Sequence, residues 1–129
     1  MSAVEQLLEP ITRSHVTAAR LPCCVETDWA SARSLSRLGA VFPVVAQLQV
    51  AAGFVAVRKT DEGLKFVEDW LRACEDSEVL QAGGEPEFAT FVRHMFDQVA
   101  FSVLFKRRGF ESFPWPDLEG VVNVSRWLE

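Results

Sequence analysis

The segment Phe91–Gln98 places a histidine, an aspartate and a glutamine on an otherwise apolar stretch. Burying a polar group costs free energy unless the group forms hydrogen bonds, so polar residues on an apolar segment are candidates for a structural or a functional role. A carboxylate such as that of Asp97 can orient a hydroxyl or accept its proton, and the side chains of His94 and Gln98 can hold a polar ligand. The alternative is that Asp97 and Gln98 only tie their segment to a neighbouring loop.

These three residues must be positioned by an element of regular structure. The apolar run continues to residues 106–108, which form a basic last turn, and Gly109 then provides a stop signal. We therefore predict one long helix that opens at Phe88. On such a helix His94, Asp97 and Gln98 lie within about one turn, on adjoining faces.

A buried strand is predicted over residues 49–57, which are rich in β-branched residues and bounded by polar turns. Gly53 lies inside this strand. A glycine there marks a bulge, or the close approach of another element or of a ligand. Packing against another element is favoured over a ligand when the strand is considered alone.

The other elements follow from periodicity and from cap residues. A helix that Thr60 or Asp61 can cap has a broad apolar face of Leu64, Phe66, Val67, Trp70, Leu71 and Cys74. Residues 21–26 are too short a segment to classify. The remaining predictions are short helix 3–9, helix 29–38, flexible loop 75–86, loop 113–116 and strand 121–128.

Size and charge limit the class of protein. The chain has 129 residues, of which 49% are hydrophobic, so we expect one domain over residues 1–129. Its net charge is -5, and its basic residues are spread out except for residues 106–108, where a helix would end. Nucleic acid is therefore not expected as a partner. We treat the basic triplet as compensation of the helix dipole.

Cysteine usage and hydropathy suggest a compartment. Cys23, Cys24 and Cys74 form neither a disulfide framework nor a zinc motif, which is typical of a reducing cytosol. The N-terminus lacks the charged and apolar regions of a signal peptide. The longest weakly polar run, residues 41–57, is too short and too interrupted to cross a bilayer. We expect a cytoplasmic protein without a membrane span.

Three stretches of the chain occur in a recognisable order. They are Gln49-Val-Ala-Ala-Gly-Phe54, Phe66-Val-Glu-Asp-Trp-Leu71 and Phe91-x-x-His-x-x-Asp-Gln98. Over about residues 26–110 the chain resembles the C-terminal half of nucleotide-sugar glycosyltransferase-like proteins with a GT-A-type fold. It departs from their pattern at Val99, where the family usually has serine. The fold expected is α/β, with a small mixed sheet flanked by helices.

The resemblance implies roles for the polar residues. Ala52 and Gly53 would let the backbone approach a bound nucleotide sugar. Asp97 would be the catalytic carboxylate, which orients an acceptor hydroxyl or accepts its proton, because glycosyl transfer needs a base or a positioned anion. Gln98 would line the sugar or acceptor pocket with Asp97, and His94 would support that pocket.

The resemblance also shows what the chain lacks. Proteins of this type ordinarily hold Mg²⁺ or Mn²⁺ with an Asp-x-Asp pair, and the chain has no such pair. Asp76-Ser-Glu78 has the spacing but belongs to a polar segment. The nucleotide-binding half that would precede residue 28 is also missing. No metal site or cofactor is therefore evident, and Mn²⁺ or Mg²⁺ is expected only if a partner or missing segment supplies the ligands.

Three interpretations remain open. The first is a glycosyltransferase-like enzyme whose donor site another chain or segment completes. The second is a non-catalytic remnant that serves as a structural or protein-interaction module. Both predict an exposed apolar face that favours a homodimer or another protein partner. The third is an unrelated α/β binding domain whose four tryptophans only pack, with Trp115 the one that could stack on a sugar or contact a partner.

Overall fold

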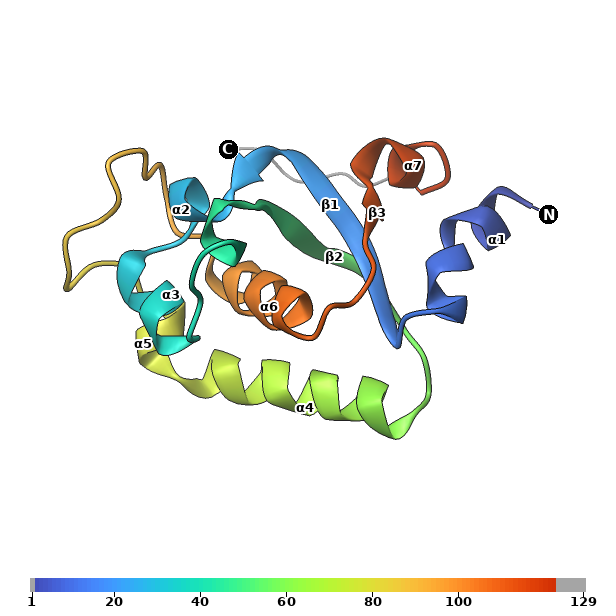
Figure 1. Ribbon diagram of the computed structural model, residues 1–129, viewed down its shortest axis with the longest axis horizontal. Coiled ribbons are helices and arrows are strands. Elements are labelled where there is room, and N and C mark those ends of the chain that lie inside the picture. Colours follow the sequence, from blue (N-terminus) through green and yellow to red (C-terminus); the bar gives the residue numbers. More distant parts are fainter. Residues whose placement is uncertain (1, 123–129) are drawn as a thin grey trace.

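A computed structural model describes residues 2–122 and shows a small mixed sheet flanked by helices (Figure 1). This confirms the predicted fold class at that level. The elements in chain order are α1 (Ala3–Leu7), the 3-10 helix η1 (Glu9–Thr12), β1 (Val16–Val25), α2 (Glu26–Trp29), α3 (Ala32–Arg37), the 3-10 helix η2 (Val44–Ala46), β2 (Leu48–Val57), α4 (Asp61–Glu75), α5 (Ser77–Leu80), α6 (Phe96–Arg107), β3 (Phe113–Pro114) and α7 (Trp115–Glu119).

The sheet has three strands in the order β2-β1-β3. The central strand β1 is antiparallel to β2 and parallel to β3. Ala18 faces Val55 and Arg20 faces Val50, so a step of two residues along β1 corresponds to a step of five along β2. Residues 51–54 of β2 therefore form a bulge, and this bulge contains Gly53, as the strand glycine indicated.

Helix α6 lies between β2 and α4 and packs against both (Figure 1). Its Phe101 and Phe105 are buried against Phe66 of α4 and against apolar residues of both long strands. The rings of Phe66 and Phe101 meet edge to face, with 5.6 Å between their centres. This aromatic contact fixes α4 against α6, because such pairs stabilise beyond the area that they bury.

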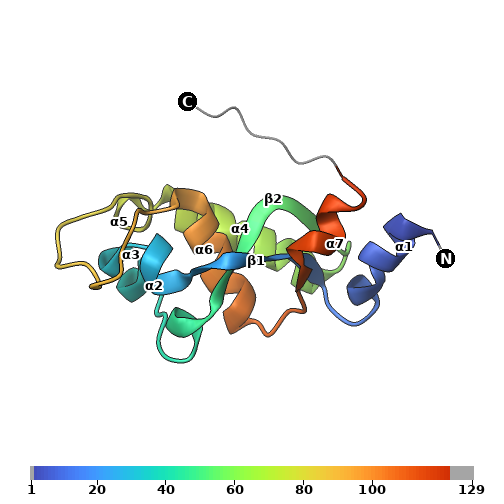
Figure 2. The ribbon, with the colours of Figure 1, turned by 90° about the horizontal axis from the view of Figure 1, so that it is seen from above.

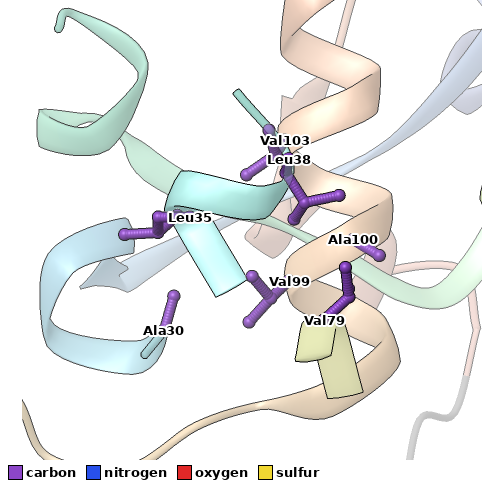
Figure 3. Close-up of a cluster of buried hydrophobic side chains, with 7 residues drawn as sticks. All are labelled: Ala30, Leu35, Leu38, Val79, Val99, Ala100 and Val103. Atoms are coloured by element: carbon purple, nitrogen blue, oxygen red, sulfur yellow. The ribbon is translucent and has the colours of Figure 1, made fainter. Parts of the chain in front are cut away.

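A second apolar cluster joins α3 and α5 to the same helix (Figure 3). Its buried members are Ala30, Leu35, Leu38, Val79, Val99, Ala100 and Val103. Seen from above, α2, α3 and α5 lie at one end of the molecule, and α1 and α7 lie at the other (Figure 2). Helix α6 therefore contacts both the sheet and the helical end.

The prediction of a helix from Phe88 was wrong, because α6 begins only at Phe96. In the preceding segment the backbone N–H of Val92 donates to the carbonyl oxygen of Asp28 at 2.6 Å, and that of Met95 donates to the carbonyl of Trp29 at 3.1 Å. Because these donors are used by α2, they do not form helical bonds within their own segment. His94 consequently precedes the helix instead of lying on it.

The predicted helix over 29–38 is two helices. Helix α2 ends at Trp29, and Ser31 begins α3 as a new cap whose hydroxyl accepts the N–H of Ser34 at 3.2 Å. A serine at this position satisfies a backbone donor that the first turn leaves free. Gly39 at φ 68° and Gly109 at φ 70° follow α3 and α6, which confirms both glycine stop signals.

The predicted loop over 75–86 was wrong in its first part. Asp76 caps the short helix α5 by accepting the N–H of Glu78 at 3.0 Å. Helix α5 buries Val79, which is 2% exposed and belongs to the cluster of Figure 3. A single apolar residue therefore anchors this turn, which its polar composition did not indicate.

Residues 21–26 belong mostly to β1, and Cys23 and Cys24 are joined by a disulfide that the cysteine count did not predict. The predicted loop 113–116 is β3 followed by the start of α7. Pro116 is tolerated there because N–H groups in a first turn have no partner within the helix. Val121 and Val122 form a turn and a bend instead of a strand, and the rest of predicted strand 121–128 lies outside the described residues.

The apolar face predicted for α4 is only partly buried. Thr60 caps this helix by accepting the N–H of Gly63 at 3.1 Å, as expected. Phe66 is fully buried, but Leu64, Val67 and Leu71 are 51%, 39% and 60% exposed. Among residues 2–122, no helix has the length and apolar character needed to span a membrane.

Candidate functional site

A cleft of about 340 Å³ opens between the bulge of β2 and the first turn of α6. It is lined by Ala52, Gly53, Arg93, Met95, Phe96, Asp97 and Gln98. Four of the five site residues proposed from sequence therefore lie around one hollow, although they come from segments more than 40 residues apart. The fifth, His94, does not line it.

Gly53 is exposed within the bulge. A Cβ atom added at this position would meet no other group within 4 Å, and the backbone is not in the left-handed region. The described structure therefore gives no packing reason for glycine here. The missing side chain leaves the cleft open at the point where Gly53 lines it.

Asp97 lies in the first turn of α6 with its side chain exposed. Its backbone carbonyl accepts the indole N–H of Trp70 from α4 at 3.1 Å. Within residues 2–122, its carboxylate makes neither a hydrogen bond nor a salt bridge. The fold thus fixes the backbone of Asp97 and leaves its carboxylate available in the cleft.

Gln98 is 5% exposed, and both its amide oxygen and its amide nitrogen form hydrogen bonds with β2. Its Oε1 accepts the backbone N–H of Ala52 at 3.4 Å, and its Nε2 donates to Oε1 of Gln49 at 2.9 Å. The amide of Gln49 in turn donates to the carbonyl of Trp29 at 3.2 Å. Gln98 therefore has a structural role, which is to hold the bulge of β2 against α6.

His94 is 4% exposed and connects the helical end of the molecule to the start of α6. Its Nδ1 accepts the backbone N–H of Ser31 at 3.1 Å, so the proton is on Nε2, which donates to the carbonyl of Val79 at 2.9 Å. Burial lowers the pKa of His94, because the charged imidazolium would lose its hydration. His94 also meets the ring of Phe96 edge to face at 5.5 Å.

Three cleft residues, Arg93, Met95 and Phe96, were not proposed from the sequence. Arg93 is exposed and adds a positive charge to the rim, and Phe96 is 53% exposed at φ 46°. A bulky residue in the left-handed region is strained, and such residues cluster at functional sites. A charged residue beside the polar trio was the available signal for Arg93. Nothing in the pattern identified Phe96, because a continuous helix was expected there.

The polar residues of α6 continue as a buried stripe of Gln98, Ser102 and Lys106, spaced four residues apart. The hydroxyl of Ser102 accepts the N–H of Val50 at 2.9 Å and donates to Oε2 of Glu26 at 2.6 Å. Lys106 pairs with the same Glu26 oxygen, and the two side chains are 9% and 0% exposed. Burial lowers the pKa of Lys106, an effect that the Glu26 carboxylate opposes. Gln98 and Ser102 thereby satisfy two backbone N–H groups of β2.

The donor set does not fit a divalent metal. Asp97 is the only carboxylate among the cleft residues, and no three histidine, cysteine, aspartate or glutamate side chains gather as a metal site would require within residues 2–122. Asp76 and Glu78 both contact Arg37, at 2.7 and 3.3 Å. The Arg37 guanidinium lowers the pKa of Asp76.

Comparisons of the chain with protein-family models, with curated proteins and with solved structures gave no match. The class that fold and site define is a small α/β domain with an open cleft between a strand bulge and a helix N-terminus.

Proposed function

We propose that the chain is the sugar-handling half of a glycosyltransferase-like domain and that the cleft binds the sugar phosphate of a nucleotide sugar. One observation carries this proposal: Ala52, Gly53 and Asp97 line one cleft, although they come from separate segments. Hydrogen bonds between β2 and α6 account for the shape of the cleft. They do not account for the exposed glycine at position 53 or for the unpaired carboxylate of Asp97.

The lining supports a division of roles. The guanidinium of Arg93 suits a phosphate, because it offers several N–H donors in a fixed plane. The exposed ring of Phe96 offers a surface for the apolar face of a sugar or base. The carboxylate of Asp97 would orient the acceptor hydroxyl or accept its proton. A partner chain or another segment would complete the nucleotide part of the donor site, whereas the cleft by itself binds the sugar phosphate.

The test is calorimetric titration of the purified chain with a panel of UDP- and GDP-sugars, in the presence and absence of Mn²⁺. We expect binding to at least one donor and a loss of about tenfold or more in Asp97→Asn. The matched control is Asp61→Asn, which changes an exposed aspartate in the first turn of another helix, α4. An equal loss in both variants would contradict a role for Asp97, and no binding to any donor would contradict the proposal.

The second candidate function is a protein-interaction module. It is favoured by the exposed stripe of Leu64, Val67 and Leu71, which share one side of α4 by their spacing. Sedimentation velocity over a range of concentrations tests it. Self-association that Leu64→Glu and Leu71→Glu both weaken would support a homodimer through α4. A monomer at all concentrations would contradict that homodimer.

A further inference from the structure

A second hollow, of about 270 Å³, adjoins the cleft. Its walls come from β1, α2, β2, the start of α6 and α7. The lining residues are Leu21, Cys24, Trp29, Gln49, Met95, Gln98 and Trp115. Met95 and Gln98 line both hollows, so the two are separated by these two side chains.

The walls of this second hollow are mainly apolar and aromatic. Leu21, Trp29, Met95 and Trp115 are each half-buried. The amides of Gln49 and Gln98 are bonded to each other and to backbone groups, so little polar capacity remains. Trp115 packs on an apolar cluster on one side. Water would find few partners on these walls, which favours an apolar occupant.

Trp29 is the least explained of these residues. It belongs to none of the apolar clusters of the described chain, and its indole N–H has no hydrogen bond there. Its backbone carbonyl holds Met95 and Gln49, which needs no particular side chain. A half-buried indole that lies outside these apolar clusters, at the wall of a hollow, is available to a ligand.

We infer that this hollow binds a planar aromatic ring system of one or two fused rings. An apolar cavity of about 150 Å³ holds benzene, so a volume near twice that size has room for a fused pair. The indoles of Trp29 and Trp115 offer ring contacts, and the sulfur of Met95 adds a favourable contact with an aromatic edge. The second N–H of the Gln98 amide is left to meet a polar group on the ring. The inference is independent of what the neighbouring cleft binds.

The test is equilibrium dialysis of the full chain against 2-naphthol, with decahydro-2-naphthol as a saturated analogue that lacks a flat face. We expect a dissociation constant for 2-naphthol below about 1 mM, which its small number of atoms permits. The analogue should bind at least about tenfold more weakly. Equal binding of the two compounds would overturn the assignment of a planar ligand.

Two variants place the binding in this hollow. Leu21→Trp fills it and Trp29→Ala removes one wall, and each should weaken binding at least about tenfold. Val41→Trp adds the same side chain at an exposed position outside both hollows and should leave binding unchanged. Circular dichroism establishes which variants fold, and Leu21→Trp decides the question if Trp29→Ala does not.

The outcomes separate this inference from the proposed function. Gly53→Leu changes only the neighbouring cleft, so it should leave 2-naphthol binding unchanged. The inference is overturned if the natural chain fails to bind 2-naphthol at about 5 mM, a concentration well above the expected dissociation constant. It is also overturned if Leu21→Trp folds and binds as tightly as the natural chain.

Discussion

Asp97 and Gln98 are neighbours on α6, yet the fold treats them in opposite ways. Gln98 begins a buried polar stripe in which each side chain has partners on β2 or on Glu26. Asp97 lies one residue earlier, exposed at the rim of the cleft, without a described partner for its carboxylate. The hydrogen bonds of a buried polar residue such as Gln98 stabilise the fold, which accounts for its presence. An unpaired carboxylate in a cleft beside an exposed glycine has no such structural role, and we attribute it to ligand binding.

The largest effect that tests this comparison is expected at Lys106. Lys106→Met leaves the carboxylate of Glu26 buried without its cation. We expect the free energy of unfolding to fall by about 3 to 5 kcal/mol. Urea denaturation measures this loss.

The matched control removes both buried charges together. In the double variant Glu26→Leu with Lys106→Met, both buried charges are absent, and most of the stability should return. A loss below about 1 kcal/mol for Lys106→Met alone would show that Lys106 and Glu26 do not form a buried charge pair.

A smaller effect is expected at Gln98. Gln98→Leu leaves the N–H of Ala52 and Oε1 of Gln49 without partners, so we expect a loss of about 1 to 3 kcal/mol, measured by the same denaturation. If Gln98→Leu were as stable as the natural chain, the structural role of this residue would be refuted.

The buried imidazole of His94 should make the stability of the protein depend on pH. Burial lowers the pKa of His94 in the folded protein, so between the folded value and the usual one near 6.5 the unfolded chain binds more protons. Stability should therefore fall as the pH drops below about 6.5, by at most about 1.4 kcal/mol per pH unit. His94→Gln should be flatter between about pH 7.5 and 5.5 in denaturation measured at each pH. Parallel curves for the two proteins would contradict the neutral buried imidazole.

The smallest effect on stability is expected at Asp97. Asp97→Asn should change the free energy of unfolding by no more than about 0.5 kcal/mol, as should Asp61→Asn on α4. Thermal unfolding of the two variants side by side provides the comparison. A large loss in Asp97→Asn alone would place Asp97 with the structural residues.

Local sequence signals predicted the elements whose stability is local. The strand over 49–57 and the helix after Thr60 followed from β-branched content, apolar spacing and a capping hydroxyl. The stops at Gly39 and Gly109 followed from the need for a left-handed residue. A bulge was one of the explanations considered for Gly53. That Ala52, Gly53, Asp97 and Gln98 would lie around one pocket was implied only by the family resemblance.

Long-range pairing explains what the sequence could not predict. The start of α6 is set by bonds from Val92 and Met95 to carbonyls of α2, more than 60 residues earlier. His94 is buried because Ser31 and Val79 supply its partners. Neither arrangement leaves a periodic pattern, so apolar spacing extended the helix back to Phe88.

Gly53→Leu, studied by unfolding and by nucleotide-sugar titration on the same preparation, tests most directly whether the cleft exists for binding. A Cβ atom at this position would meet no neighbour within 4 Å, so stability should be unchanged or slightly raised. The leucine side chain would fill the space that Gly53 leaves in the cleft, so donor binding should be lost. A stable Gly53→Leu protein that binds a nucleotide sugar as tightly as the natural chain would contradict a binding role for this cleft.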